Sequence, residues 1–305
     1  MDGNRRFARS HQIETVEGHN LGFEALAKIL EVCYKSGVEV VTIYAFSVEN
    51  FKRSKYEVDA LMDMAHVKLK QLTQHGDLLD RYGACIRILG ERDMVKPDLL
   101  DAINKAVELT SHNKKAVLNV CFPYTSRDEL TTAIRNTVAD FSNPVPETQR
   151  SFSASNITQK IQSRRNSSSP QRGNSPSASN SDPELEDSAS STTTLHPDTP
   201  PSQDLRETSA AVYPDPESIT SKTIDEHLYT FGDPPLDLLV RTSGVERLSD
   251  FMLWQCHEKT DIVFLQRLWP EFDLWSFLPV MVEWQWRRKK LEQKNRQSVE
   301  GIAAR

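Results

Sequence analysis

The chain has 305 residues, of which 38% are hydrophobic and 26% are charged, and its net charge at pH 7 is −6. This composition is typical of a soluble globular protein, and no apolar run approaches the roughly 20 residues of a transmembrane helix. An integral membrane protein is therefore excluded. The negative charge disfavours a nucleic-acid binder, so any anion site has to be a local concentration of arginine.

The chain carries none of the common cofactor signatures. It has neither a GxxxxGK[ST] phosphate loop nor a GxGxxG dinucleotide fingerprint. The four cysteines are 36 or more residues apart and lack the paired CxxC spacing of a zinc site: Cys33, Cys85, Cys121 and Cys256. We interpret them as reduced cytosolic thiols packed in a core.

Short apolar runs alternate with longer segments of helical period along the chain. The runs, residues 38–48, 85–89, 117–122, 236–240 and 262–265, are nearly continuous, as in strands buried on both faces. Strands alternating with helices predict an α/β fold, a single domain with a central mostly parallel sheet flanked by helices. Ligands of such sheets bind beyond the carboxyl ends of the strands.

Three segments between these runs have helical patterns. The first presents one apolar face made of Leu26, Ile29, Leu30 and Cys33. The second, from Tyr56 to about Thr73, places apolar residues at positions 58, 61, 62, 65, 69 and 72. The third continues the stripe Leu130, Ala133, Ile134, Thr137 and Val138. Ser54 with Glu57, and Ser126 with Glu129, match the capping box that begins a helix.

Residues 141–217 differ from the rest of the chain. They contain ten of the sixteen prolines, seventeen serines and only three of the 24 aromatic residues. Such a segment buries too little apolar surface to offset its ordering entropy, so we predict a disordered insert. The predicted organisation is a catalytic α/β domain in two parts, 1–140 and 218–292, interrupted by the insert and followed by a polar tail, 293–305.

Polar residues follow two of the predicted strands. Ser47–Arg53 follows the first strand, and Arg241 to Ser249 follows the fourth, with Arg247 six residues after Arg241. Two arginine forks beside serine hydroxyls suit a diphosphate. A solvated turn with surface arginines is the alternative for this motif alone.

The start of the chain joins a carboxylate, Asp2, to a glycine and two cations, Arg5 and Arg6. This set suits Mg²⁺ and phosphate oxygens, although a frayed, charged terminus is the favoured explanation when the motif is read alone.

Together these motifs resemble the cis-prenyltransferases, and most closely the eukaryotic dehydrodolichyl diphosphate synthases of fungal type. The resemblance is carried by MDGNRRFAR at 1–9, GH at 18–19, YAFSVENFKRS at 44–54, LNVCFPYTSRDE at 118–129, RTSGVERLSDFMLWQ at 241–255 and LWPEF at 268–272. It implies a cis-prenyltransferase fold with a hydrophobic product tunnel, lined in part by the helix that carries Leu61, Met62 and Ala65. It also implies successive cis additions of isopentenyl diphosphate to farnesyl diphosphate, giving a long-chain polyprenyl (dehydrodolichyl) diphosphate for dolichol synthesis and protein glycosylation.

The resemblance also implies roles for individual residues. Asp2 corresponds to the metal-binding position for Mg²⁺, and Asp2 and Asn50 are the expected catalytic residues. Asn50, with Ser47, matches the positions implicated in orienting the substrate and removing the proton. The allylic diphosphate is expected among Gly3, Asn4, Arg5, Arg6 and His19, with Phe51 and Arg53 beside the substrate. Isopentenyl diphosphate is expected on Arg241, Arg247 and Ser249.

Two further expectations concern the ends of the chain. Family members carry an apolar strand just before MDGN, so we expect a truncated start, with Asp2 poorly anchored as written. Single-chain members end with an Arg-x-Gly motif that reaches a partner's active site, and residues 284–305 contain none. We therefore expect a homologous, membrane-anchored partner that carries this motif and holds the chain peripherally at the cytosolic face of the endoplasmic reticulum.

Other functional classes remain open at this point. A non-catalytic scaffold subunit of the same fold is the main alternative to an enzyme. A scaffold has no reason to keep the aspartate, the asparagine and both arginines at matching places, which favours catalysis. A phosphate-binding module that is not an enzyme would need the tunnel to be absent.

Overall fold

A computed structural model describes residues 1–73, 78–144, 212–257 and 259–303. Contacts between Cα atoms divide the chain into two units. One unit combines Met1–Ala139 with Ile219–Arg305, and the other is Asp140–Ser218. Most of the predicted insert, residues 141–217, lies outside the described residues, so its disorder stays a prediction.

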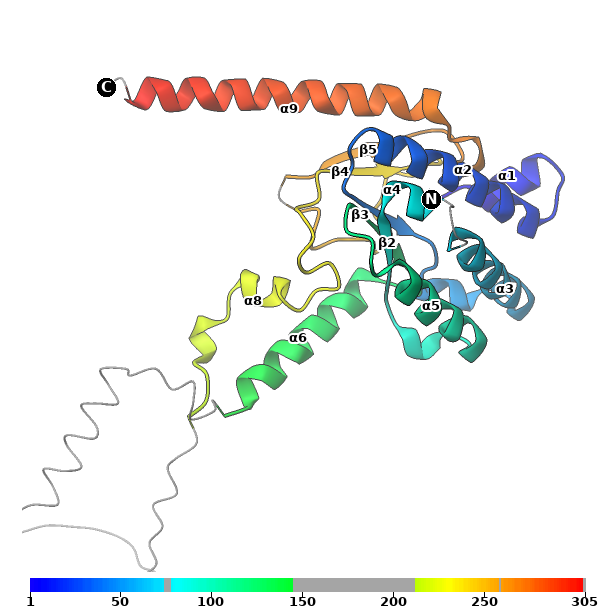
Figure 1. The fold of residues 1–305 in the computed structure, drawn as a ribbon, viewed down its shortest axis with the longest axis horizontal. Helices are drawn as coiled ribbons and strands as arrows, with labels where there is room; N and C mark the ends of the chain where they lie inside the picture. Colours follow the sequence, from blue (N-terminus) through cyan, green and yellow to red (C-terminus); the bar gives the residue numbers. More distant parts are fainter. Residues whose placement is uncertain (74–77, 145–211, 258, 304–305) are drawn as a thin grey trace, which may run out of the picture. The chain divides into compact units, whose positions relative to one another are not determined.

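A three-stranded parallel sheet forms from the first three apolar runs (Figure 1). β1 (Val40–Tyr44), β2 (Ala84–Leu89) and β3 (Ala116–Cys121) pair in the order β1-β3-β2. Ile43 lies opposite Val120, and Ile86 lies opposite Leu118. All four side chains are buried, as expected for parallel strands covered by helices.

One polar row crosses this otherwise apolar sheet. Thr42, Asn119 and Arg87 are in register on the three strands. Asn119 Nδ2 donates to Asp233 Oδ2 at 2.7 Å, and Arg87 donates to Asp233 Oδ1 at 2.7 Å. The row therefore anchors the segment that leads into β4 (Leu238–Arg241) against the sheet.

Helices of the first 110 residues pack around these strands: α1 (Asn4–Ser10), α2 (Thr15–Lys35), α3 (Lys55–Leu72), α4 (Leu78–Tyr82) and α5 (Pro97–Thr110). The predicted cap of α3 is confirmed, because Ser54 Oγ accepts from the Glu57 N–H at 3.3 Å. α5 packs on β2 and α3, while α2 packs on α1 and on the short 3₁₀ helix η5 (Trp269–Glu271). The predicted apolar face of α2 is buried.

The prediction for α6 (Ser126–Ser142) is partly wrong. Its buried face contains Ala133 and Thr137, whereas Ile134 and Val138 are 51% and 56% exposed. The predicted capping box is also absent: Thr125 accepts from the Asp128 N–H at 3.4 Å, and Glu129 is buried. Glu129 instead accepts hydrogen bonds from the Tyr124 hydroxyl, the Gln255 amide and the Tyr229 N–H, and burial raises its pKa.

The last two predicted strands pair with each other in parallel. β4 and β5 (Asp261–Phe264) form a separate two-stranded sheet among the described residues, so the α/β class is confirmed but the strands form two sheets rather than one. β5 is also less buried than predicted, since Ile262 and Phe264 are 39% and 36% exposed. Residues of β1 in the first sheet and of β4 in the second sheet line the same cavity.

Two further helices complete the described chain. α8 (Ser221–Asp225) is short, and α9 (Leu274–Ala303) extends through most of the segment predicted as a polar tail. No described helix combines the length and apolarity that crossing a membrane requires. The four cysteines are free, and Cys33, Cys121 and Cys256 are buried.

Candidate active site

A cavity of about 1340 Å³ lies at the carboxyl ends of β1 and β4 and extends back between these strands. This volume exceeds the roughly 300–1000 Å³ of most small-molecule sites. Its lining has two chemically different parts. The polar end comprises Asp2, Gly3, Asn4, Arg5, Arg6, His19, Ser47, Asn50, Arg53, Arg241, Arg247 and Ser249. The apolar body comprises Leu26, Ile29, Leu30, Cys33, Leu238, Phe272, Phe277 and Met281.

Backbone contacts hold Asp2 in place at the polar end. Its N–H donates to Thr242 Oγ1 at 3.1 Å, and its carbonyl accepts from the Thr242 hydroxyl at 2.9 Å and from the Trp269 N–H at 3.0 Å. The expectation that Asp2 is poorly anchored is therefore wrong. Residues after β4 and in η5 supply the anchoring.

The Asp2 carboxylate faces two guanidinium groups. Oδ2 accepts from Arg241 at 2.9 Å and lies 3.8 Å from Arg6. Burial would raise the pKa of Asp2, but hydrogen bonds from Arg241 and Ser243 and the charges of Arg241 and Arg6 together lower it. Asp2 is therefore ionised at neutral pH and presents a carboxylate to the cavity.

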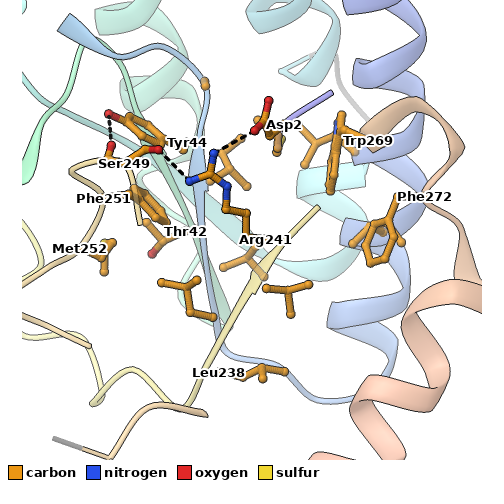
Figure 2. A pocket seen from close by; sticks show the side chains of 18 of the residues that line it. Asp2, Thr42, Tyr44, Leu238, Arg241, Ser249, Phe251, Met252, Trp269 and Phe272 are labelled. Carbon is orange, nitrogen blue, oxygen red and sulfur yellow. Dashed lines mark hydrogen bonds and ion pairs between the residues drawn. The ribbon is translucent and has the colours of Figure 1, made fainter. Parts of the chain in front are cut away.

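Arg241 is the centre of the polar end (Figure 2). Its guanidinium lies between Asp2 and Ser249, donating to Ser249 Oγ at 2.7 Å and also to the Arg247 carbonyl. Its side chain is only 13% exposed, and its Nε is buried without a partner. The fork is thus fixed before any ligand arrives, which favours binding of an anion at low entropic cost.

The start of α1 lies against the same end. Gly3 has φ of 113°, a left-handed conformation that favours glycine, and it turns the chain from Asp2 into the helix. Arg6 donates to the Ser243 hydroxyl, and Arg5 lies 3.4 Å from Glu57. The oxygen of the Asn4 amide is buried without a partner.

His19 lies beside this group with its ring Nε2 buried and unpartnered. Burial, with a smaller effect of the Arg53 charge, lowers its pKa to about 4, so the imidazole is neutral at pH 7. Arg53 itself donates to Glu57 at 2.9 Å. Three residues of the polar end, Asn4, His19 and Arg241, therefore each carry one buried side-chain atom without a hydrogen-bond partner, which is unusual for buried polar atoms. The unpartnered Asn4 oxygen packs against Gly22 of α2.

The segment after β1 forms the 3₁₀ helix η1 (Val48–Lys52). Ser47 caps it by accepting from the Glu49 N–H, and Asn50 Oδ1 accepts from the Ser47 N–H at 3.1 Å. The amide of Asn50 thereby has its acceptor engaged, and its remaining group, Nδ2, is a donor. Asn50 is oriented by its own backbone turn to offer hydrogen atoms to a ligand.

Phe51 is the one predicted site residue that the structure does not bring to the cavity. It packs on Phe46 instead, with ring centroids 5.1 Å apart. The alternation of side-chain directions within the 3₁₀ turn points Asn50 and Phe51 to different sides. Phe51 thus belongs to the core that supports the turn.

The apolar body is built from helix faces and strand backbones. Of the three residues predicted to line a tunnel, only Leu61 contacts the cavity, whereas Met62 is buried in the core and Ala65 packs against it. The walls come mainly from α2, through Leu26 to Cys33, and from η5 and α9, through Phe272 to Met281. The predicted α3 lining is therefore confirmed for Leu61 and wrong for Met62 and Ala65.

The polar end fits a magnesium ion only together with a substrate. Among the described residues, no group of three His, Cys, Asp or Glu side chains is placed to hold a metal. Mg²⁺ is commonly bound by one or two carboxylates plus phosphate oxygens and water. Asp2, ionised and beside the guanidinium groups of Arg241 and Arg6, matches this mode.

Several residues at the site were not predicted. Thr242, Ser243 and Trp269 hold Asp2 and Arg6, and Arg127 and Asp250 also line the cavity. Thr242 and Ser243 follow Arg241 directly, so their place at a strand exit was a usable signal. Trp269 acts through its backbone N–H, for which side-chain type gives no signal.

Comparison with known proteins agrees with this geometry. A family model described as "Putative undecaprenyl diphosphate synthase" matches residues 1–172 and 181–292. A dehydrodolichyl diphosphate synthase complex subunit of Schizosaccharomyces pombe is 41% identical over 285 residues, covering 93% of this chain and 82% of that protein. A human dehydrodolichyl diphosphate synthase complex subunit is 34% identical over 292 residues, covering 96% and 67%.

Solved structures give the same fold. A lavandulyl diphosphate synthase from Lavandula x intermedia, crystallised with dimethylallyl diphosphate, has a TM-score of 0.65 at 24% identity and covers 93% of this chain and 92% of its own. At that identity the likeness concerns the fold alone. The family match covers most of the chain and the cavity carries the family's motif residues at one end, so the chain belongs to the cis-prenyltransferase family of polyprenyl diphosphate synthases.

Proposed function

We propose that this chain is the catalytic subunit of a dehydrodolichyl diphosphate synthase. It adds isopentenyl diphosphate units to farnesyl diphosphate and releases a long-chain polyprenyl diphosphate. The observation that carries the proposal is one cavity with a fixed, arginine-rich polar end and a long apolar body. This pairing matches a substrate with a diphosphate head and a growing hydrocarbon chain.

The polar end provides two groups of donors for two diphosphates. Asn4, Arg6 and the backbone of Gly3 and Arg5 stand at the start of α1, and Arg241, Arg247 and Ser249 stand at the exit of β4. The allylic diphosphate leaves when the charge on its oxygens is stabilised, and preorganised donors do this most effectively. We assign the α1 group to the allylic diphosphate and the β4 group to isopentenyl diphosphate.

Asp2 lies between the two groups and would hold Mg²⁺ with diphosphate oxygens. The ion would supply positive charge to the leaving diphosphate. Arg241 contacts the Asp2 carboxylate and Ser249, which supports a role in keeping the two diphosphates at a fixed separation. Two substrates held at a fixed separation lose little further entropy on reaching the transition state.

Asn50 orients the substrate in this proposal but does not take the proton. Its carbonyl oxygen is engaged by the Ser47 N–H, and a neutral amide is a poor base in any case. The Asp2 carboxylate is paired with Arg241, whereas the released diphosphate would carry oxygens able to accept a proton. Proton removal is therefore assigned to that leaving group, with Asn50 donating a hydrogen bond to a diphosphate oxygen.

A scaffold subunit without activity is the second candidate. Its cavity would not need an ionised aspartate held beside a fixed arginine fork. The relatives are named subunits of a complex, which supports a partner for this chain. We infer a homologous partner that carries Arg-x-Gly, and peripheral association with the endoplasmic reticulum membrane on its cytosolic face through that partner.

The test is product formation. The chain, alone and co-purified with its Arg-x-Gly-bearing relative, is incubated with labelled isopentenyl diphosphate, farnesyl diphosphate and Mg²⁺, and the extracted lipids are sized. We expect long polyprenyl products that require Mg²⁺ and the partner. Absence of labelled lipid in both samples would refute the enzymatic assignment, and equal turnover by the lone chain would refute the partner requirement.

A further inference from the structure

The loop that carries Ser249 has an unusual backbone. Ser249, Asp250 and Met252 have φ of 51°, 61° and 50°, and none of them is glycine. The left-handed region is unfavourable for residues with a Cβ, and three such residues within four positions persist only when their surroundings hold them. The contacts that hold this loop therefore decide where the Ser249 hydroxyl lies.

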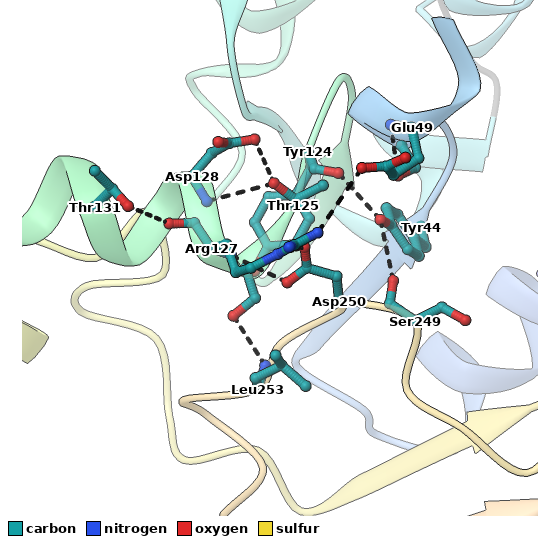
Figure 3. Close-up of polar contacts among 12 residues, drawn as sticks. Tyr44, Glu49, Tyr124, Thr125, Arg127, Asp128, Thr131, Ser249, Asp250 and Leu253 are labelled. Carbon is teal, nitrogen blue, oxygen red and sulfur yellow. Dashed lines mark hydrogen bonds and ion pairs between the residues drawn. The ribbon is translucent and has the colours of Figure 1, made fainter. Parts of the chain in front are cut away.

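Asp250 makes the contacts that hold the loop (Figure 3). Its carboxylate accepts from the Arg127 N–H at 3.1 Å through Oδ1 and from Arg127 Nε at 2.7 Å through Oδ2. Its backbone carbonyl accepts from the Ser126 N–H at 2.8 Å. The Asp250 side chain is 13% exposed and the Arg127 side chain is 71% exposed, so the carboxylate is shielded from water while the guanidinium is not.

The other partner in these contacts is the first turn of α6. The N–H groups at a helix start have no partner within the helix. Asp250 lies 123 or more residues away in sequence and accepts hydrogen bonds from two of these groups, the N–H of Ser126 and the N–H of Arg127. Ser126 returns a contact, since its hydroxyl accepts from the Leu253 N–H at 3.1 Å. The loop is thus held on both sides of Phe251.

The same arginine also reaches the other wall of the polar end. Arg127 lies 3.8 Å from Glu49 on η1, the turn that positions Asn50. On the opposite side of the loop, the Tyr44 hydroxyl donates to the Tyr124 carbonyl at 3.1 Å and lies 3.5 Å from the Ser249 carbonyl. The Tyr44 ring stacks on Phe251 with centroids 4.7 Å apart. Ser249 in turn accepts from Arg241 at 2.7 Å and from Arg247 at 3.1 Å.

We propose that Asp250 and Arg127 are positioning residues for the isopentenyl diphosphate group of the site. Together they hold the loop of residues with positive φ in a conformation in which the Ser249 hydroxyl accepts hydrogen bonds from the guanidinium groups of Arg241 and Arg247. The proposal rests on the proposed function for the identity of the substrate. It assigns neither residue a direct role in the chemical step.

Steady-state kinetics with each substrate varied separately tests this assignment. The variants are Asp250→Ala, Asp250→Asn and Arg127→Ala, assayed as the full chain with its partner. Asn tolerates the left-handed conformation and keeps one acceptor for the Arg127 N–H, so it isolates the loss of the Nε contact. We expect KM for isopentenyl diphosphate to rise about tenfold to a hundredfold in Asp250→Ala, and less in the other two variants. KM for farnesyl diphosphate stays within about twofold.

Calorimetric binding of inorganic pyrophosphate gives a readout independent of turnover. We expect weaker binding in Asp250→Ala, coupled non-additively to Arg127→Ala in the double variant. Arg135→Ala, an exposed arginine further along α6, is the matched control and should bind like wild type. If wild type binds pyrophosphate but makes no product, the proposed function is wrong. The positioning role is then decided by pyrophosphate binding to the variants.

Two results would overturn the positioning role. One is an unchanged KM for isopentenyl diphosphate and unchanged pyrophosphate binding in folded Asp250→Ala. The other is an equal rise of both KM values together with a large fall in melting temperature, because that pattern reports general unfolding. The Asp250→Asn variant distinguishes general unfolding from a loss of positioning, because asparagine tolerates the left-handed conformation that this position requires.

Discussion

The two ends of the cavity are built in opposite ways. The polar end gathers side chains from the start of α1, from η1 and from the exit of β4. Hydrogen bonds between distant segments fix the start of α1 against the exit of β4, while a local bond between Ser47 and Asn50 fixes η1. The apolar body uses the inner faces of α2 and α9, whose residues also belong to the hydrophobic core. We therefore expect catalysis to depend on a few hydrogen bonds at the polar end. The room for the hydrocarbon chain should depend on the volume of the side chains that line the apolar body.

The largest expected effect comes from breaking the polar end at its centre. Arg241→Ala removes a guanidinium fork together with its contacts to Asp2 and Ser249. We expect kcat/KM to fall by about 10²–10³-fold, the usual cost of losing one preorganised donor to a developing anion. Initial rates over a range of isopentenyl diphosphate concentrations measure this.

The matched control for this variant is Arg135→Ala, which removes an equal charge from an exposed position of α6. It should retain wild-type rates. A folded Arg241→Ala variant with unchanged KM and kcat would contradict the assignment of the β4 exit to diphosphate binding.

The apolar body should respond to volume instead of charge. Cys33 lines the cavity on α2 and is 5% exposed. In Cys33→Trp we expect shorter products with the early additions retained, because the indole occupies space that the lengthening chain needs. Thin-layer or mass-spectrometric sizing of the lipids measures this, and a thermal melt checks folding because overpacking costs about 1–3 kcal/mol.

Lys28→Trp provides the comparison on the same helix, since Lys28 is exposed. Its product lengths should equal those of wild type. Unchanged lengths in a folded Cys33→Trp variant would show that the chain does not grow along α2.

A third prediction concerns pH and stability. The pKa of His19 falls from 6.5 to about 4 on folding, so the unfolded chain binds the extra proton between these values. The free energy of unfolding therefore decreases as pH falls from 6.5 to 4, by up to roughly 3 kcal/mol for this group. Urea unfolding of wild type and His19→Asn across this range isolates the contribution, because the variant lacks it.

His112→Asn, at an exposed position, controls for the loss of any histidine. Its pH profile should follow that of wild type. Parallel profiles for wild type and His19→Asn would mean that His19 is not held neutral by the fold.

The smallest effect is expected from the serine- and proline-rich segment. Replacing residues 145–211 with about ten Gly and Ser residues should leave turnover and melting temperature nearly unchanged, because loop closure costs little and depends weakly on length. Activity assays and a melt of the shortened chain measure this. Failure of the shortened chain to fold would show that the segment packs on the catalytic domain.

The sequence pattern predicted the elements that local rules govern. Apolar runs located the strands, and Ser54 marked the start of α3 correctly. The cap of α6 was predicted one residue too late, since Thr125 and not Ser126 accepts from the helix. The Asp250 contact could not be predicted, because a partner 123 residues away leaves no local signature. The exposed side chains of β5 were also missed, since a short apolar run does not reveal which face a neighbour covers.

The sequence predicted which residues form the candidate site better than it predicted the contacts that hold them. Motif residues at strand exits reached the polar end, with Phe51 as the exception. The positive φ angles of Ser249, Asp250 and Met252 could not be foreseen, because none of them is glycine. The sequence identified α3 as a wall of the apolar body, but only Leu61 of α3 lines the cavity and α2 supplies more of the wall. Both helices carry apolar stripes, and periodicity does not say which one faces a cavity.

The most direct test of the central claim asks which subunit performs the chemistry. The complex of this chain with its Arg-x-Gly-bearing partner is compared with a complex in which this chain carries Asp2→Ala and Arg241→Ala, at equal assembly measured by size-exclusion chromatography. Incorporation of labelled isopentenyl diphosphate into polyprenyl lipid should be lost in the variant complex. Full incorporation by that complex would contradict the account, because it would show that this chain is a scaffold and that its polar end takes no part in the reaction.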